Sequence, residues 1–408
     1  MVVTSCPRFL QVLFGIAAGL LRVPQLRLLR QLTVAWLKGC GGKLVRAAQL
    51  VKGRHRTSLA RFLGKSSWDA PTLLARIVLF ILRWLRPRQG EFLYLLIDDS
   101  RLRKRARRMA GVKKIWDHVG QRFVRGHIVV TAAVLFRGLT LPWRFTLWLP
   151  QEYCRKKHRK FVKLTDIAAE IVRTFTPPPG LKVRVLFDAF YLCKGLTAAC
   201  EHRGFSWFSV ASRNRLLARD GRQRRIGDLG PGLLKHHGQR VRLRRARGWR
   251  WMTIAAVDGR LKKIGPVRLV FGKRPRDPWK NLVAIVTNET ALSARDIVAT
   301  YERRWAIEVL FKELKGTFGL GEYQMQKRQG IERHLHLSGL AHLALTHHGL
   351  EAVGAQAKQA NKDVLLPRFQ ERLDAMRRAM RHDDIERFVR RIRHDKIRRR
   401  VHKYLLAA

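Results

Sequence analysis

The chain has 408 residues, of which 84 are Lys or Arg and 29 are Asp or Glu, so its formal net charge is +55 at neutral pH. A hydrophobic content of 46% predicts a folded protein of two or three domains and excludes a disordered basic tail. A folded chain with this charge repels itself unless a polyanion is near, which makes nucleic acid the first partner to expect.

The first 88 residues are expected to be helical, because Leu, Val and Arg recur there at three- and four-residue spacing. A turn with Ser66, Ser67 and Asp69 offers caps for the second of two apolar helices. We interpret this segment as a DNA-binding module, with a scaffold role as the alternative. The apolar stretch within it, Phe9 to Leu21, is too short to span a bilayer.

Strand patterns begin with the apolar run from Phe92 to Ile97, which predicts a buried strand that stops at Asp98 and Asp99. A basic run, "RLRKRARR", comes next. Two further strands are expected around a tight turn at Arg137 and Gly138.

A helix is expected over residues 160–174, ending before "TPPPG". The segment "LKVRVLFDAFYL" predicts another buried strand with Asp188 at its end, followed by a short helix and a fifth strand. Residues 213–250 are strongly basic, with little apolar periodicity, and are followed by β patterns. A helix then begins near Ser293.

Acidic residues lie on three separate predicted elements. Asp98 with Asp99 ends one strand, Asp188 ends another, and Glu308 lies on the helix that begins near Ser293. Acids at strand ends of an α/β sheet converge at one edge, where ligands bind. Converging carboxylates favour Mg²⁺ or Mn²⁺ over zinc, and two such ions activate a water or a 3′-hydroxyl in phosphodiester transfer. Taken singly, an acid at a strand end is more often a turn or cap residue.

The segment "YERRWAIEVLFKELK" carries Tyr301, Arg304, Glu308 and Lys315. At ~100° per residue these positions share one helical stripe about 60° wide, and most of the remaining circumference is apolar. A half-buried helix with such a stripe needs partners or a ligand for its charges. Arg304 and Lys315 suit phosphates as charge-assisted donors. The alternative is an intrahelical ion pair between Arg304 and Glu308.

The pattern Y-x-x-R-x-x-x-E-x-x-x-x-x-x-K, together with Trp305 and Ile307 in "RW-I-E", resembles the YREK branch of DDE transposases from bacterial insertion sequences. "LLIDDS" and "LFDAFYL" are similar to the segments that hold the two aspartates of that family. The resemblance covers about residues 90–350. It implies an RNase H-like catalytic domain and cut-and-paste DNA transposition in a bacterial cytoplasm, at the nucleoid.

The resemblance further implies a site for two Mg²⁺ or Mn²⁺ ions made by Asp99, Asp188 and Glu308. Asp99 is chosen because it precedes Ser100, with Asp98 as the alternative. Tyr301, Arg304 and Lys315 are then expected to contact transposon-end phosphates. Enzymes of this family carry a β-rich insertion before the helix with the last glutamate, and residues 212–278 fit it. An aromatic side chain from this insertion is expected to hold a flipped base, with Trp249 and Trp251 the nearest candidates, although core packing is the commoner role for each.

The expected partners are double-stranded DNA with terminal inverted repeats, target DNA and a second copy of the chain. Two other functions stay open: a noncatalytic nucleic-acid-binding protein, and an RNase H-like nuclease that cuts without joining. The fold expected is α/β, an RNase H-like mixed sheet flanked by helices. A helical N-terminal domain is expected over 1–88 and a catalytic domain over 89–211 and 279–330, interrupted by a basic β-rich insertion over 212–278. The helical C-terminal region, 331–408, is the candidate for dimerisation.

Overall fold

The computed structural model describes residues 7, 10–51, 55–117, 120–245, 248–359 and 363–390. Five helices open the chain, as the apolar spacing predicts: α1 (Gln11–Ala18), α2 (Val23–Leu37), α3 (Leu44–Leu50), α4 (Arg56–Gly64) and α5 (Ala70–Trp84). Asp69 caps α5, and its carboxylate accepts a hydrogen bond from the backbone N–H of Thr72 at 3.2 Å. One of the three expected cap residues is thereby identified.

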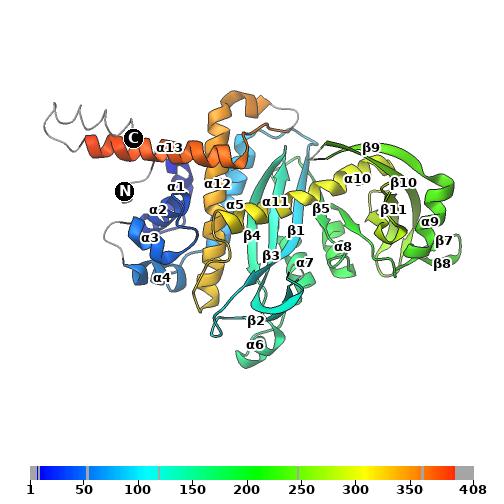
Figure 1. Ribbon diagram of the computed structural model, residues 1–408, viewed down its shortest axis with the longest axis horizontal. Coiled ribbons are helices and arrows are strands. Elements are labelled where there is room, and N and C mark those ends of the chain that lie inside the picture. The colour runs from blue at the N-terminus through cyan, green and yellow to red at the C-terminus, as the bar shows by residue number, and fades with distance from the viewer. Residues whose placement is uncertain are drawn as a thin grey trace.

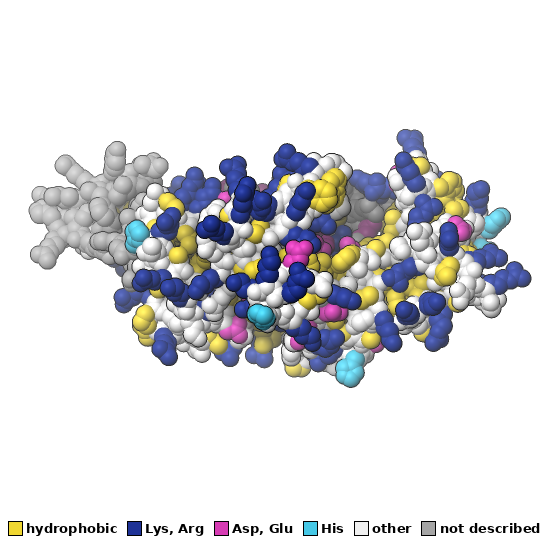
Figure 2. Space-filling view, turned by 90° about the horizontal axis from the view of Figure 1, so that it is seen from below, with side chains coloured by type: hydrophobic (Ala, Val, Ile, Leu, Met, Phe, Trp, Pro, Cys, Tyr) yellow, Lys and Arg dark blue, Asp and Glu magenta, His cyan; other side chains and the backbone are white. Residues whose placement is uncertain are grey.

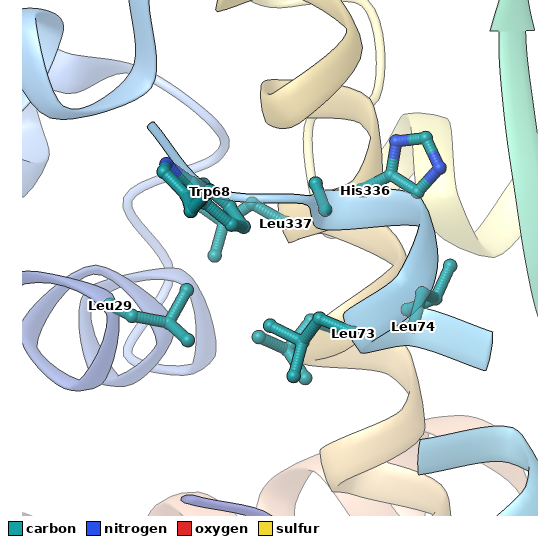
Figure 3. A pocket seen from close by; sticks show the side chains of 8 residues that line it. Leu29, Trp68, Leu73, Leu74, His336 and Leu337 are labelled. Atoms are coloured by element: carbon teal, nitrogen blue, oxygen red, sulfur yellow. The ribbon is translucent and has the colours of Figure 1, made fainter. Parts of the chain in front are cut away.

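A long helix, α12 (Arg328–Gln359), packs against α2, α4 and α5 and also against the sheet, which α5 contacts directly as well (Figure 1). Its Leu337 and His336 face Leu29 of α2, Leu73 and Leu74 of α5, and Trp68 (Figure 3). Arg333 of α12 donates to the carbonyl oxygens of Leu63 and Trp68 at 3.0 and 2.7 Å. The five N-terminal helices are therefore attached to the rest of the chain through buried contacts with α12.

The last of the described helices, α13 (Phe369–Val389), packs against α12. Leu373, Met376 and Met380 are buried along it, and Lys38 at the end of α2 forms an ion pair with its Asp384. The helical region expected to mediate dimerisation spans 331–408, and its last part, residues 391–408, lies outside the described residues. None of the described helices is both long enough and apolar enough to cross a membrane.

Twelve strands of the described residues form one mixed sheet (Figure 1). Strand β1 is antiparallel to β3 and parallel to β5, and β5 is parallel to β6. The turn at Arg137 and Gly138, with positive φ at both residues, joins β3 to β4 as expected. The strands of this half are β1 (Phe92–Arg103), β2 (Lys113–Asp117), β3 (Arg122–Phe136), β4 (Leu139–Leu147), β5 (Lys182–Phe187) and β6 (Ser206–Val210).

The basic insertion extends the same sheet. β12 (Val283–Thr287), which follows the insertion in the chain, pairs with β6 on one side and with β11 on the other, so the sheet continues without a break into the insertion. The insertion strands are β7 (Leu216–Arg219), β8 (Arg222–Arg225), β9 (Gln239–Arg245), β10 (Gly248–Leu261) and β11 (Gly265–Lys273). The expected α/β fold, a mixed sheet flanked by helices, is confirmed.

Three local predictions need correction. β1 does not stop at the acids but continues to Arg103, because β3 pairs with it as far as Gly126. The helix expected over 160–174 is α7 (Leu164–Thr174), and a short helix, α6 (Gln151–Lys156), precedes it; α8 (Lys194–His202) lies where expected. The insertion contains a helix, α9 (Ile226–His237), whose Pro231 and glycines conceal the helical pattern.

A largely buried ion pair connects β5 to the loop that follows β12. Arg184 of β5 binds Glu289 through two bonds of 2.8 and 2.6 Å, and its guanidinium lies 3.6 Å from the ring centre of Phe92. Glu289 follows β12 by two residues, so the pair holds this loop against β5. The fork geometry and the aromatic contact offset the desolvation of both charges.

We expect Arg184→Ala to lower the free energy of unfolding by about 2 kcal/mol, because the substitution leaves the partly buried Glu289 without its partner and removes the packing of the guanidinium on Phe92. The matched control is Arg173→Ala, which removes an exposed pair with Glu170 and should change stability by less than about 0.5 kcal/mol. Urea denaturation followed by circular dichroism measures both. Equal losses in the two variants would contradict a structural role for the Arg184 pair.

Candidate active site

Two of the predicted acids lie side by side at the end of β5. The pairing of β1 with β5 ends at Ile97 and Phe187, so Asp98 and Asp188 are the next residues on two neighbouring parallel strands. Residues in register on adjacent strands project to the same face of a sheet. The Asp188 carboxylate also accepts hydrogen bonds from the backbone N–H groups of Phe190 and Tyr191, at 3.0 and 3.3 Å, which fixes the turn after β5.

The third acid comes from a helical segment that runs across the sheet (Figure 1). Ser293 caps α10 (Ala294–Glu302), as the predicted start requires, and α11 (Ala306–Gly316) carries Glu308. The single helix predicted here is interrupted by a 3-10 turn, Arg303–Trp305. The apolar side of this segment is also not fully covered, since Trp305 of the 3-10 turn is 63% exposed and Val309 of α11 is 45% exposed.

Arg304 joins two of the acids. Its Nη1 donates to Oδ2 of Asp98 at 2.7 Å, and its Nη2 lies 3.6 Å from Oε1 of Glu308. The intrahelical pair with Glu308 is therefore present, but the shorter bond is to Asp98, 206 residues away in sequence. The guanidinium neutralises carboxylate charge between β1 and α11.

Electrostatic effects connect the acids at the end of β5. Asp98 is only 8% exposed, and its pKa is raised to about 7: burial is the largest cause, Arg304 opposes the rise, and Asp188 and Glu308 add to it. Burial also raises the pKa of Asp99, which Arg101 lowers and Asp188 raises. Like charges that perturb each other in this way are typical of functional carboxylate sites.

Asp98 and Asp99 differ in what they face. Successive residues of a strand project to opposite faces. Asp98 meets Arg304, whereas Asp99 accepts a hydrogen bond of 3.3 Å from the hydroxyl of Tyr191, which is buried. Tyr191 was not singled out from the sequence; its position three residues after Asp188 was the available signal.

The remaining residues of the polar stripe divide into two positions. Tyr301 is partly buried next to Arg304; burial raises its pKa to about 12 while Arg304 opposes the rise, so its hydroxyl stays protonated at neutral pH. Lys315 is exposed near the end of α11, and its ammonium lies 5.7 Å from the ring centre of Phe311. Tyr301 therefore belongs to the carboxylate cluster, and Lys315 extends the stripe away from it.

The expected site for two divalent ions is made of Asp99, Asp188 and Glu308. Within the described residues, no three or more His, Cys, Asp or Glu side chains are gathered closely enough to hold a metal ion. The oxygen donors of Asp98, Asp188 and Glu308 suit a hard divalent cation. A cationic guanidinium, that of Arg304, already lies between two of them, so the cluster fits positive charge but is not arranged as a ligand set.

Of the two tryptophans suggested for a flipped base, the side chain of Trp249 lies outside the described residues. The Trp251 side chain is 46% exposed, with the Arg240 guanidinium 4.9 Å from its ring centre. The expectation that Trp251 packs in the core is therefore wrong.

Two family models match the chain. A model described as DDE superfamily endonuclease matches residues 41–264, more than half of the chain, and includes Asp98, Asp99 and Asp188. A model described as archaeal putative transposase ISC1217 matches residues 278–349, which contain Tyr301 and Glu308. No curated protein matches the sequence. These matches support a DDE-type transposase without singling out the YREK branch, and the chain belongs to the DDE superfamily endonucleases.

Proposed function

We propose that the protein is a transposase that excises and inserts DNA by phosphodiester hydrolysis followed by strand transfer. The observation that carries the proposal is the cluster of Asp98, Asp188 and Glu308 around Arg304, to which the middle of β1, the end of β5 and α11 each contribute one acid. Membership of a nuclease superfamily and the match to a putative transposase support it.

Two divalent ions, Mg²⁺ or Mn²⁺, are proposed as the cofactor, because endonucleases of this superfamily generally use divalent metals. Bound ions of this kind activate the attacking oxygen and stabilise the leaving one. Asp188 and Glu308 are the proposed ligands together with an aspartate of β1. The expected ligand there was Asp99; the contacts of Asp98 with Arg304 make Asp98 the stronger candidate.

Arg304, Tyr301 and Lys315 are proposed as phosphate-binding residues. Arg304 is held by Asp98 and Glu308 in this state. Once other cations neutralise these carboxylates, its guanidinium is free to donate to a phosphate oxygen. The protonated Tyr301 hydroxyl is a donor beside it, and the exposed Lys315 ammonium provides a further cation along the same stripe.

The proposed partners are DNA ends with inverted repeats, target DNA and a second copy of the chain. One face of the molecule shows Lys and Arg side chains along the whole described length, with a few acidic side chains near its middle (Figure 2). This distribution supports binding of a polyanion, and affinity should fall steeply as salt rises.

The test is incubation of the full chain with a plasmid that carries the gene and its flanking DNA, in Mg²⁺, in Mn²⁺ and with a chelator. Metal-dependent double-strand cuts at both flanks, followed by joining of the released ends to a second plasmid, are the expected products. Binding without any cut would leave a noncatalytic DNA-binding protein.

A second function, a nuclease that cuts without joining, is favoured by the description of the matching family as endonucleases. The same reactions separate the two functions. Cut ends that never join the second plasmid, although 3′-hydroxyl groups are present on them, would support the nuclease and contradict the transposase.

A further inference from the structure

A β-ribbon extends from the sheet beyond the carboxylates. β5 ends at Phe187, but β1 continues to Arg103, which pairs with Gly126 of β3. From Gly126 to Arg122, β3 continues past the end of β1 and pairs with β2. The ribbon therefore projects past the edge at which Asp188 lies, toward the lower part of Figure 1, where β2 is labelled. DNA that reaches the carboxylates from this edge passes the ribbon.

The two faces of the ribbon differ. On one face Ile115 is buried and Asp117 forms an ion pair with Arg103. On the other face, Lys114 pairs across the strands with Arg125, and Trp116 with Phe123. We call these four residues the ribbon face. It combines two cations and two aromatic rings.

The ribbon face is exposed at its aromatic end. Phe123 is 59% exposed, its ring centre lies 5.0 Å from that of Trp116 at an interplanar angle of 71°, and the Lys114 ammonium is 4.9 Å from it. Lys114 and Arg125 are exposed too, and within the described part of the chain neither forms an ion pair. Like charges directly opposite on two strands are destabilising, so this arrangement costs stability unless an anion binds.

Duplex DNA relieves both features at once. Its phosphates neutralise the two cations, and bases that are unstacked by bending offer flat surfaces to an exposed ring. An acidic peptide would satisfy Lys114 and Arg125 but provides no such surface for Phe123. Cation and aromatic side chains in alternation are the combination that nucleic acid requires.

The register places the ribbon face on the same side of the sheet as Asp98. Asp98 pairs with Thr131 of β3, and every second residue from Thr131 back to Phe123 projects to that side. Eight residues at about 3.3 Å each give roughly 26 Å, which corresponds to about eight base pairs at ~3.4 Å per base pair.

We propose that the ribbon face binds the DNA duplex about eight base pairs from the scissile phosphate, with Phe123 against unstacked bases and with Lys114 and Arg125 on phosphates. The position relative to the cut rests on the proposed function; the contact itself does not. Phe123 and the two cations are binding residues, remote from the carboxylates.

The test measures binding by the full chain in chelator, so that no cleavage occurs, to a duplex taken from the DNA that flanks the gene. 2-Aminopurine replaces single bases along it. We expect the wild type to raise the fluorescence most about eight base pairs from the cleavage position, and Phe123→Ala to remove that rise and weaken binding about tenfold. The double variant Lys114→Ala/Arg125→Ala should lower the slope of log K against log salt by about 1.8.

Matched controls lie on α13 and beside it. Arg378→Ala/Arg381→Ala removes two exposed cations, and Leu365→Ala removes an exposed apolar side chain. If these controls change slope or fluorescence as much as the ribbon variants do, the proposal is overturned. Phe123→Leu is the second variant, for the case that Phe123→Ala does not fold, because leucine keeps most of the apolar volume. It should still lose the fluorescence rise. A wild type that binds with this rise but never cuts DNA would refute the proposed function and leave the ribbon contact standing.

Discussion

Asp98→Asn should lower the rate of DNA cleavage by about 10³-fold, whereas Asp99→Asn should lower it by less than about tenfold. The larger factor corresponds to about 4 kcal/mol of transition-state stabilisation, as expected when a carboxylate that holds a catalytic metal is lost. Asp98 is in register with Asp188 and contacts Arg304, which itself contacts Glu308; Asp99 is bound by the Tyr191 hydroxyl instead.

Asp188→Asn provides the reference for a full loss in that experiment, and filter binding or gel shift in chelator shows whether each variant still binds DNA. Single-turnover cleavage in Mg²⁺ and in Mn²⁺ gives the rates. The reverse order, with Asp99→Asn inactive and Asp98→Asn near wild type, would restore the assignment that the family resemblance favours. Tyr191→Phe is a further control, because it removes only the hydrogen bond to Asp99.

The sequence predicts those parts of the site that have a local pattern. The apolar runs before Asp98 and Asp188 identify both strands, and the helical spacing identifies the stripe with Glu308. The fold class follows from the order of these elements. Each of these inferences depends on the order of apolar and polar side chains within one element, continuous in the two strands and periodic in the helix, which is information the chain carries locally.

Other features depend on contacts between distant segments. The continuation of β1 through its basic end is set by backbone pairing with β3, which leaves no apolar pattern in "RLRKRARR". The bond between Arg304 and Asp98 joins residues 206 positions apart, so the sequence offered only the neighbouring Glu308 as its partner. Which of two adjacent aspartates faces that arginine is decided by register, and register is a property of the assembled sheet.

Asp98 contributes to the free energy of unfolding of the metal-free protein, and this contribution should decrease as pH rises from about 4 to about 7. Burial, together with Asp188 and Glu308, raises the pKa of this carboxyl to about 7 in the folded chain against Arg304, while an unfolded aspartate has a pKa near 3.9. The folded state therefore holds a proton that the unfolded state loses, and this contribution is complete below pH 4 and is lost as pH passes 7. Asp98→Asn removes the ionisation, so we expect it to stabilise the metal-free protein by about 2–4 kcal/mol at pH 8 and by little at pH 4.

Thermal denaturation in chelator between pH 4 and pH 8 measures this difference, with Asp220→Asn, an exposed carboxylate, as the control that should show no pH-dependent gain. Divalent metal adds a second readout. Because metal binding requires the ionised carboxylate, Mn²⁺ should raise the melting temperature of the wild type more at pH 8 than at pH 5, and should do so much less in Asp98→Asn. A stability difference between wild type and Asp98→Asn that stays constant across this pH range would show that Asp98 ionises normally, and the carboxylate cluster would then lack the charge repulsion that a bound cation is proposed to relieve.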